Sequence, residues 1–322
     1  MKNLKYFWIL FVLYFVFAHP AIIYYNIPRN NIADENPIIA LLLLAIAVIG
    51  WTIVLVILAR SIYKNTYGQR TNISKILQSG RSVVGTVISS KTLPSNDDRY
   101  VPKEVTVEFN NFAKQTVRYT LTINDSQPQL RRYELDKKLR LCIDEQLRYP
   151  PYILPEDIQA KLHPGRIATL YILWGLFVFA IIGYFLYAYK TENNGYGWRF
   201  LVAYHPLLLS LYMIALFGFI GYMIKGGWYN RAARGSKGMK LLLFGNKTNA
   251  TVLSATQTGT YINNQPEVKF NLSFMDTKGR THQTSIKKIV NLLNLSYIHK
   301  ETKTILYLPE EPEVIAFEED IE

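Results

Sequence analysis

The sequence predicts a membrane protein in which four α-helical transmembrane segments alternate with two duplicated, small β-rich α+β domains. Three observations predict this fold class. They are four long apolar stretches without charged residues, a one-sided distribution of positive charge, and a motif that recurs at a constant offset in the second half of the chain. The 322 residues are enough for more than one folded unit.

The four apolar stretches contain no Asp, Glu, Lys or Arg, and they cover residues 6–25, 37–59, 167–189 and 200–224. At about 1.5 Å per residue, a helix of each length crosses a hydrocarbon core of about 30 Å. A helix buried in a soluble domain is seldom apolar on all sides over such a length. We therefore expect a multi-pass protein of a bacterial inner (plasma) membrane.

The first apolar stretch also has features of a signal peptide. Lys2 and Lys5 precede it, and Val16-Phe17-Ala18 is an acceptable cleavage triplet. The apolar run continues to Tyr25, which is long enough to span, so we expect the segment to be retained.

Positive charge is concentrated on one side of the predicted spans. Of the 36 Lys and Arg residues, the short loops 26–36 and 190–199 carry only Arg29, Lys190 and Arg199. The positive-inside rule then places both short loops outside, and both termini with segments 60–166 and 225–322 in the cytoplasm.

The net charge of +12 does not require a nucleic-acid partner. A basic segment follows the last apolar stretch, and its members are Lys225, Arg231, Arg234, Lys237 and Lys240. Such segments attract anionic lipid headgroups. The sequence lacks the aromatic and basic interleaving typical of RNA-binding modules, so we expect no nucleic-acid binding.

The recurring motif divides the chain into two similar halves. The offset in residue number from Gly80 to Gly245 also relates Thr86-Val87 to Thr251-Val252, Ser89 to Ser254, and residues 138–143 to 303–308. A period near half the chain indicates duplication. We expect a hairpin of two spans at 1–59, a β-rich domain at 60–166, a second hairpin at 167–224 and a second β-rich domain at 225–322.

Alternating apolar residues predict the strands of each β-rich domain. In the second domain we expect strands at 249–256, 267–274, 281–286 and 302–308, a turn at Gly279 and a helix at 286–295. In the first domain we expect strands at 81–90, 104–109, 115–123 and 139–143, with a helix at 127–137. The acidic tail 310–322 is expected to be solvated or to pair with the basic segment.

A family resemblance rests on the centre of the second domain. The matching residues are Gly245, Ala250, Val252, Thr258, Gly259, Ile262, Asn263 and Pro266. They resemble a family of bacterial integral membrane proteins of unknown function in which a small β-rich domain, with the pattern T-G-x-x-I-N-x-x-P, follows a transmembrane helical hairpin. The first domain keeps Gly80, Val87 and Pro102 but has "LPSNDDRY" in place of that centre. The resemblance implies a membrane-tethered, non-catalytic module and no particular reaction.

The same centre is the candidate partner-binding loop, made of Gly259, Tyr261, Asn263, Asn264 and Gln265. A tyrosine offers a rigid amphipathic ring, and side-chain amides bind a partner's backbone. In the alternative interpretation Gly259 and the two asparagines only shape a turn, and Ile262 fills the core.

A candidate intramembrane polar pair is formed by His19 and His205, each of which precedes a proline. Helical rise places both at about 8–9 Å from the outer ends of their spans. The alternative is that each histidine bonds only to a backbone carbonyl beside its proline. Two histidines without a carboxylate or cysteine partner do not predict a metal site, and we expect no catalytic residue, metal or cofactor. The adjacent Asp97 and Asp98 are expected in a solvated loop.

These patterns favour a non-catalytic inner-membrane protein that displays two cytosolic protein-binding domains, as a scaffold, an accessory protein or a toxin-immunity protein. The alternatives are a channel or transporter built on a parallel repeat and a membrane enzyme with an unrecognised site. Small residues at Ala215, Gly218 and Gly221 would allow helices to pack closely, within one chain or between copies in a homo-oligomer.

Overall fold

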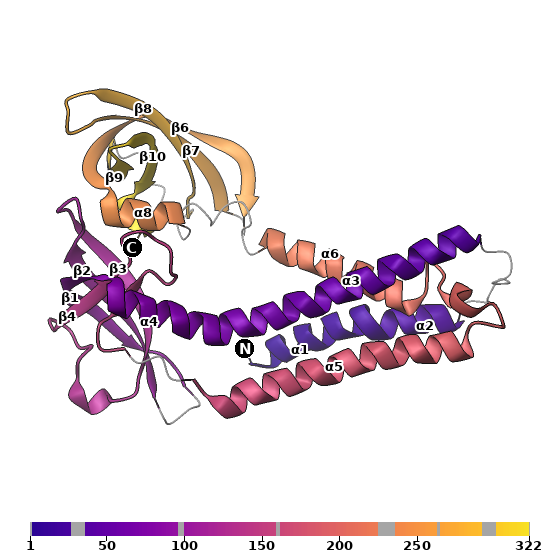
Figure 1. The fold of residues 1–322 in the computed structure, drawn as a ribbon. Coiled ribbons are helices and arrows are strands. Elements are labelled where there is room, and N and C mark those ends of the chain that lie inside the picture. The colour runs from indigo at the N-terminus through magenta and orange to yellow at the C-terminus, as the bar shows by residue number, and fades with distance from the viewer. Residues whose placement is uncertain are drawn as a thin grey trace. The chain divides into compact units, whose positions relative to one another are not determined.

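A computed structural model describes residues 2–26, 36–95, 100–158, 162–224, 236–262, 265–291 and 301–321. The chain forms two compact units (Figure 1). A helix unit takes segments 1–71 and 161–227, and a sheet unit takes segments 72–160 and 228–322. The segments expected to be β-rich therefore contribute to one unit.

The helix unit begins with α1 (Lys2–Leu13), a π-helical turn η1 (Tyr14–Ala18) and α2 (His19–Asn26). Helix α3 (Pro37–Tyr63) starts at the cap Asn36, whose side chain accepts from the Ile38 backbone N–H, and continues through η3 (Lys64–Gly68) into α4 (Gln69–Ser79). The second half holds α5 (Pro164–Thr191), η5 (Gly197–Phe200) and α6 (Pro206–Ile224).

In the described part of the chain, four helices are long and apolar enough to cross a membrane: Tyr6–Asn26, Pro37–Ser79, Pro164–Thr191 and Pro206–Met223. They overlap the four predicted stretches, but two bounds differ: the second helix continues past residue 59 to Ser79, and the fourth begins later than predicted. The fourth helix starts at Pro206 and not at residue 200, because proline has no N–H to donate and suits the first helical turn. His205 therefore lies just before this helix and not within it.

Close contacts join the helices of this unit. The buried Trp51 of α3 donates from Nε1 to the backbone oxygen of Leu207 on α6 at 2.9 Å. Gly50, one residue earlier, faces Leu211, and a Cβ atom there would lie only 2.7 Å from a Leu211 methyl. The missing side chain lets α3 and α6 approach each other closely, as small residues do between apolar helices.

The sheet unit contains two five-stranded antiparallel sheets. The first has strands β1 (Arg81–Thr92), β2 (Val101–Asn110), β3 (Thr116–Asp125), β4 (Lys138–Ile143) and β5 (Ile153–Pro155) in the order β3-β2-β1-β4-β5. The second has β6 (Asn246–Ile262), β7 (Gln265–Met275), β8 (Thr281–Ile289), β9 (Thr302–Leu308) and β10 (Glu311–Phe317) in the order β10-β9-β6-β7-β8. The two strand orders are the same when β1 is matched with β6.

The pairing registers agree as well. Val87 faces Val107 in the first sheet and Val252 faces Leu272 in the second, so both partners are displaced by the offset that separates Gly80 from Gly245. Each pairing also has a bulge at the next residue, Ile88 in β1 and Leu253 in β6. Since a one-residue slip would turn every side chain to the other face, this shared register gives the two sheets the same core positions.

The offset changes at the fourth strand, which corrects the sequence alignment. Residues 138–143 were expected to match 303–308, but Arg81 pairs with Ile143 while Asn246 pairs with Tyr307. The structural match of β4 is therefore 302–307, one residue earlier. The chain between the third and fourth strands is one residue shorter in the second half.

A short helix, α8 (Ser236–Phe244), connects the two sheets. Leu241, Leu242 and Leu243 are buried in one hydrophobic core together with Val107 of the first sheet and Leu306 of the second. The core inside the second sheet, around Phe270, is separate. Helix α8 thus precedes the second sheet, as α4 precedes the first, and also completes the core of the first sheet.

The turn between β2 and β3 binds the end of α8. Asn111, which is buried, donates from Nδ2 to the backbone oxygens of Leu242 and Gly245 at 3.0 and 2.9 Å. Its Oδ1 accepts from the Gln115 backbone N–H. In the second sheet the equivalent residue is Asp276, whose Oδ1 accepts from the Arg280 N–H in the same way. The two turns share their geometry but only the first holds a helix.

Two predicted helices are wrong as helices. Residues 127–137 contain only the short η4 (Pro128–Leu130) and then turns with Arg131 and Asp136 at positive φ, so the chain cannot continue a right-handed helix there. Residues 286–289 belong to β8, where Ile286 pairs with Phe270. The rest of that prediction lies outside the described residues, apart from Val290, which is buried, and Asn291, which is exposed.

The acidic tail is structured along most of its length. It forms β10 and then α10 (Glu318–Ile321), with Phe317 and Ile321 buried. Lys240 of the basic segment pairs with Glu311 at 3.2 Å, so the expected pairing with that segment occurs at this lysine. Residues 225–235 of the segment lie outside the described residues.

Candidate functional site

A buried polar cluster forms in the helix unit around Glu192, the residue that follows α5. Tyr24 of α2 and His205, which precedes α6, bond to its Oε2 at 2.9 and 3.1 Å. Tyr25 donates to Oε1 at 2.7 Å. Glu192, His205 and Tyr24 are at most 2% exposed, so the carboxylate is held by protein donors and not by bulk water.

The hydrogen bonds define the charge state of this cluster. The Leu207 backbone N–H donates to Nδ1 of His205, so this nitrogen carries no proton and Nε2 is the one that donates to Glu192. Burial opposes ionisation of Glu192, but the bonds from His205, Tyr25 and Tyr24 outweigh it and lower the pKa of the carboxyl. The bonds from His205, Tyr25 and Tyr24 therefore favour the ionised form of the Glu192 carboxyl.

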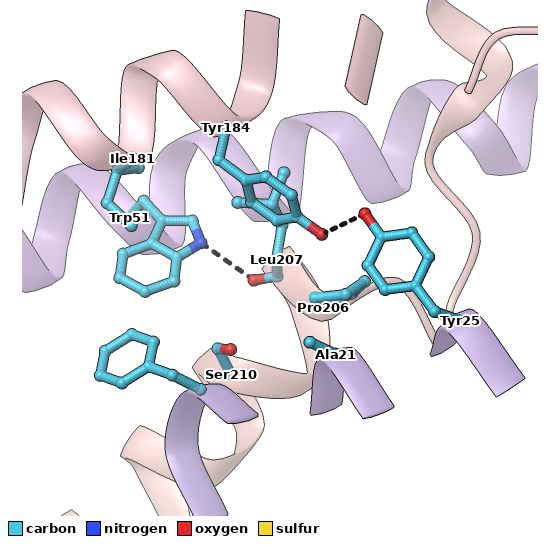
Figure 2. A pocket seen from close by; sticks show the side chains of 9 residues that line it. Ala21, Tyr25, Trp51, Ile181, Tyr184, Pro206, Leu207 and Ser210 are labelled. Carbon is cyan, nitrogen blue, oxygen red and sulfur yellow. Dashed lines mark hydrogen bonds between the residues drawn. The ribbon is translucent and has the colours of Figure 1, made fainter. Parts of the chain in front are cut away.

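A cavity of about 250 Å³ shares one lining residue with this cluster, Tyr25, whose side chain is drawn in Figure 2. Tyr25 and Tyr184 reach its wall, and their hydroxyl oxygens lie 3.3 Å apart. Aromatic and small side chains form the rest of the lining, with members Phe17, Ala21, Trp51, Ile181, Pro206, Leu207 and Ser210. The lining is thus mostly apolar, and its side-chain hydroxyls are those of Tyr25, Tyr184 and Ser210.

The structure gives His205 a different partner from the one predicted. Both of its ring nitrogens are engaged, with Glu192 and Leu207, and its ring is surrounded by Tyr24, Tyr184 and Phe200. The described ring contacts of His19 are with Tyr14 and Phe15 of its own helical segment. A direct contact of His19 with His205 stays a prediction.

Sequence reasoning missed Glu192, because it lies one residue beyond α5 and counts as part of a loop. A usable signal was present. Tyr24, Tyr25 and Tyr184 were visible as hydroxyl donors near the same ends of their helices, together with His205 and the carboxylate of Glu192. Buried carboxylates need such donors, so this set could have been considered from the residues near the loops 26–36 and 190–199.

The candidate partner-binding segment lies at the end of the β6–β7 hairpin. It is paired strand and not loop up to Ile262, which faces Gln265, while Tyr261 faces Pro266. Gly259 has φ of +81° and lies in an irregularity between Gln257 and Tyr261, so it forms a bulge in β6 rather than the turn. Asn263 and Asn264 lie outside the described residues.

The side chains at this hairpin end do not belong to the core. Tyr261 is 60% exposed and Ile262 is 39% exposed, so Ile262 does not fill the core as the alternative interpretation expected. At the base of the segment, Thr258 donates from Oγ1 to Glu267 Oε2 at 2.6 Å, which joins the two strands. The result is an ordered hairpin that presents an aromatic and an aliphatic side chain to solvent.

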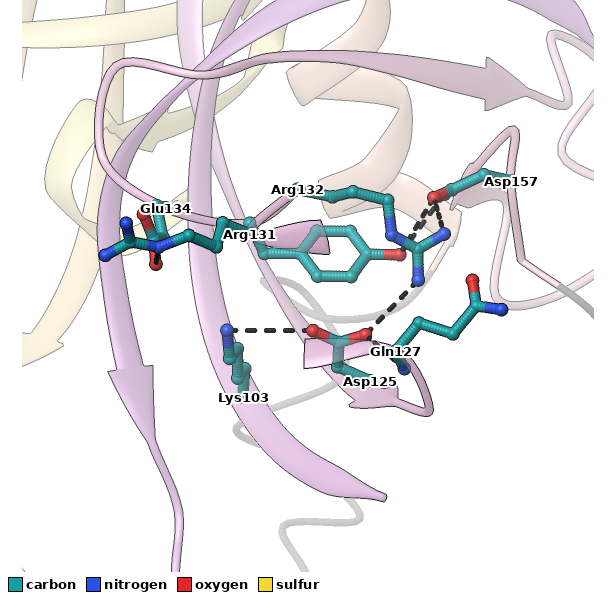
Figure 3. A network of polar contacts seen from close by, with 8 residues as sticks. Lys103, Asp125, Gln127, Arg131, Arg132, Glu134 and Asp157 are labelled. Carbon is teal, nitrogen blue, oxygen red and sulfur yellow. Dashed lines mark hydrogen bonds and ion pairs between the residues drawn. The ribbon is translucent and has the colours of Figure 1, made fainter. Parts of the chain in front are cut away.

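A second polar network lies at the ends of the edge strands of the first sheet (Figure 3). Asp125, at the end of β3, accepts from Arg132 at 3.2 Å and lies 3.6 Å from Lys103. Arg132 also pairs with Asp157, which follows β5, and Tyr133 donates to the same carboxylate at 3.2 Å. Because β3 and β5 are the edge strands of the sheet, this network joins its two edges.

A basic cavity of about 480 Å³ lies beside this network. Its charged lining residues are Arg131, Arg132, Lys137, Lys138, Arg140, Glu156 and Asp157. Lys137, Lys138 and Arg140 are exposed, and Asp157 is already paired with Arg132. The surface therefore offers an excess of positive charge to an acidic group.

The described ranges contain no group of three or more His, Cys, Asp or Glu side chains that could hold a metal ion. Asp97 and Asp98 lie outside those ranges. Comparison with models of known protein families and with curated proteins gave no match. The assignment of a function therefore depends on the geometry of these sites.

Proposed function

We propose that this chain is a four-pass bacterial inner-membrane protein whose helices carry a non-catalytic, protein-binding scaffold on the cytoplasmic side. The surface of the helices supports membrane insertion. Leu10, Ile38 and Phe179 are 67%, 68% and 76% exposed, and large apolar side chains are exposed along all four long helices. Surfaces of this kind are stable in lipid and not in water.

Duplication of one sheet is the second part of the proposal. It is supported by the shared strand order, by the constant offset between the copies over the first three strands and by the matching bulges at Ile88 and Leu253. Bulges are specific local features, and two in the same place are difficult to explain by independent origin. Helix α8 then joins the copies through a common core, which gives a scaffold with fixed geometry.

The observation that carries the binding function is the exposed end of the β6–β7 hairpin. Tyr261 and Ile262 are ordered and paired through the backbone, yet they leave the core to residues further along β7. A rigid aromatic residue next to an aliphatic one is a favourable anchor for a protein partner, because little side-chain entropy is lost on binding. The matching position of the first domain lacks this sequence, so the two copies would differ in what they bind.

The partner class follows from these surfaces. The hairpin end suits an apolar patch of a protein, and the basic cavity near Arg140 suits an acidic segment or anionic lipid headgroups. A scaffold, an accessory protein and a toxin-immunity protein all need such surfaces on a polytopic body without an active site.

Site-specific photocrosslinking in membranes tests this proposal. A photoreactive residue replaces Tyr261 in the full-length chain, and a matched control replaces Met275, which is equally exposed (60%) on the same hairpin but at its other end. We expect a defined crosslinked protein at position 261 and not at 275. The double variant Tyr261→Ala, Asn264→Ala should lose the partner without a change in melting temperature.

Two outcomes would contradict the recognition role. One is equal crosslinking at positions 261 and 275, which indicates random encounter. The other is full partner binding by the double variant, or a fall in melting temperature large enough to explain the loss.

A channel or transporter is the second candidate, and the polar cluster at Glu192 is the observation that favours it. Charged groups inside a membrane protein are costly to bury and commonly mark a transport pathway. The test is ion flux into liposomes that contain the purified chain, with Glu192→Gln as the comparison. Flux that depends on Glu192 would favour transport over a pure scaffold.

A further inference from the structure

We propose that the helix unit binds a small organic ammonium group in the cavity lined by the rings of Tyr25, Trp51 and Tyr184, which is connected to Glu192 through the Tyr25 hydroxyl. This inference is independent of the partner-binding surface on the sheet unit. It rests on the charge of the Glu192 carboxylate, on the chemistry of the cavity wall and on the size of the cavity.

The first step concerns charge. The carboxylate of Glu192 is buried, and Nδ1 of its histidine partner accepts from the Leu207 backbone N–H. Within the described ranges, neither Lys nor Arg forms an ion pair with Glu192. A buried negative charge is most stable when a positive charge lies near it. A cation in the cavity would supply that charge.

The second step concerns hydrogen-bonding capacity at the wall. Tyr25 donates its hydroxyl proton to Glu192, so Tyr184 must be the donor in the 3.3 Å contact between the two tyrosines. Trp51 donates its only polar proton to the Leu207 backbone oxygen. The polar protons of these three residues are therefore committed, whereas the Tyr184 oxygen retains acceptor lone pairs. The Tyr184 oxygen and the Ser210 hydroxyl can therefore accept hydrogen bonds from an ammonium group in the cavity.

The third step concerns the aromatic lining. Phe17, Tyr25, Trp51 and Tyr184 surround the cavity (Figure 2). The faces of aromatic rings attract cations, and sites that combine several rings with a nearby carboxylate are typical of ammonium recognition. A volume of about 250 Å³ admits a compact head such as an ethanolammonium group and excludes a drug-sized molecule.

The ammonium group has two sources with the same chemistry, the amine headgroup of a lipid and a free alkylammonium ion in water. The test uses the full-length chain in nanodiscs of phosphatidylglycerol, which contains no amine. Ethanolamine and short-chain phosphatidylethanolamine are titrated separately, with ethanol as the uncharged analogue. The readout is tryptophan fluorescence, and Trp51→Phe shows which part of the signal comes from the cavity.

We expect saturable binding of ethanolamine, of the amine lipid or of both, and none of ethanol. Saturation by ethanolamine identifies a site for a free ion, and saturation by the lipid alone identifies a headgroup site. Glu192→Gln should weaken binding at least tenfold, whereas Glu145→Gln, an exposed carboxylate of the sheet unit, should leave it unchanged. Ala21→Leu, which fills the cavity without touching the carboxylate, should abolish binding in a variant that melts normally.

The proposal is overturned if the folded wild-type chain binds neither probe, or if ethanol binds as well as ethanolamine. It is also overturned if Glu192→Gln and Ala21→Leu, both folded by their melting temperature, retain wild-type affinity. In the case that Glu192→Gln does not fold, the Ala21→Leu result decides.

Discussion

Replacing Asn111 by aspartate should separate α8 from the first sheet. The amide of Asn111 makes two buried hydrogen bonds, to the backbone oxygens of Leu242 and Gly245 at the end of α8. An aspartate keeps the shape and the acceptor for Gln115, but it loses both donors and places a carboxylate against the negative end of a helix. At about 1 kcal/mol for each lost bond and about 1 kcal/mol for the helix end, the cost is about 3 kcal/mol.

The single cysteine provides the assay. Cys142 is buried on the α4 side of the first sheet, and burial raises the pKa of its thiol, so it reacts slowly in the folded state. Thiol labelling of the full-length chain in dilute urea then reports how often the first sheet opens. A loss of about 3 kcal/mol corresponds to labelling that is roughly 100-fold faster. The control is Asn110→Asp, the same change at the adjacent, exposed position.

The prediction is wrong if Asn111→Asp accelerates labelling of Cys142 by less than tenfold, or by no more than Asn110→Asp does. Either result would mean that the two amide bonds do not hold α8 against the first sheet.

Three further predictions concern other parts of the chain. Gly245→Ala should lower the melting temperature of the second sheet, because the added Cβ would lie 2.3 Å from the backbone oxygen of Leu241. The control Gly218→Ala should have little effect, because the space around its Cβ is open. The hydrogen bond from His282, together with those from Arg280, outweighs burial and holds the pKa of Asp276 well below its usual range. The ionised Asp276 carboxylate therefore stabilises the fold above about pH 4, and this stabilisation is lost as the pH falls further. Urea unfolding between pH 3 and 6 should show this loss in the wild type and a flatter profile in Asp276→Asn. In a Cys142→Ala background, cysteines at Asn194 and Asn31 should react with a membrane-impermeant reagent in intact cells, and reaction only after permeabilisation would reverse the proposed topology.

The repeated part of the fold was predictable because its signal is local. Gly80 and Gly245 end their helices by the same bond to the residue four positions earlier, and alternating apolar residues define β2 and β7. The central strands, the turn at Gly279 and the four apolar helices follow from these patterns. The displaced register of β9 was not predictable, since shifting a short apolar strand by one residue leaves its composition almost unchanged.

The errors arose where tertiary contacts override local preference. Residues 286–289 have apolar spacing that suits a helix, but pairing with β7 makes them an edge strand. The acidic tail looked solvated because its carboxylates outnumber its apolar residues, yet Phe317 is buried and Lys288 forms ion pairs with Glu319 and Asp320. Glu192 was missed for a related reason, because its donors come from helices distant in the sequence.

Asn111 and Asp276 occupy equivalent turns of the two sheets but differ in whether their side chains can hold the end of a helix. The turn of the first sheet holds the helix that precedes the second sheet, which is a head-to-tail contact between the two similar halves. Contacts of this type can in general be repeated from one copy to the next. In the turn of the second sheet, the Asp276 carboxylate stands where the first sheet has the Asn111 amide. This carboxylate is hydrogen-bonded to Arg280 and His282. A carboxylate cannot donate to the carbonyl end of another helix. The turn at Asp276 therefore cannot hold a further helix by the two amide bonds with which the turn at Asn111 holds α8.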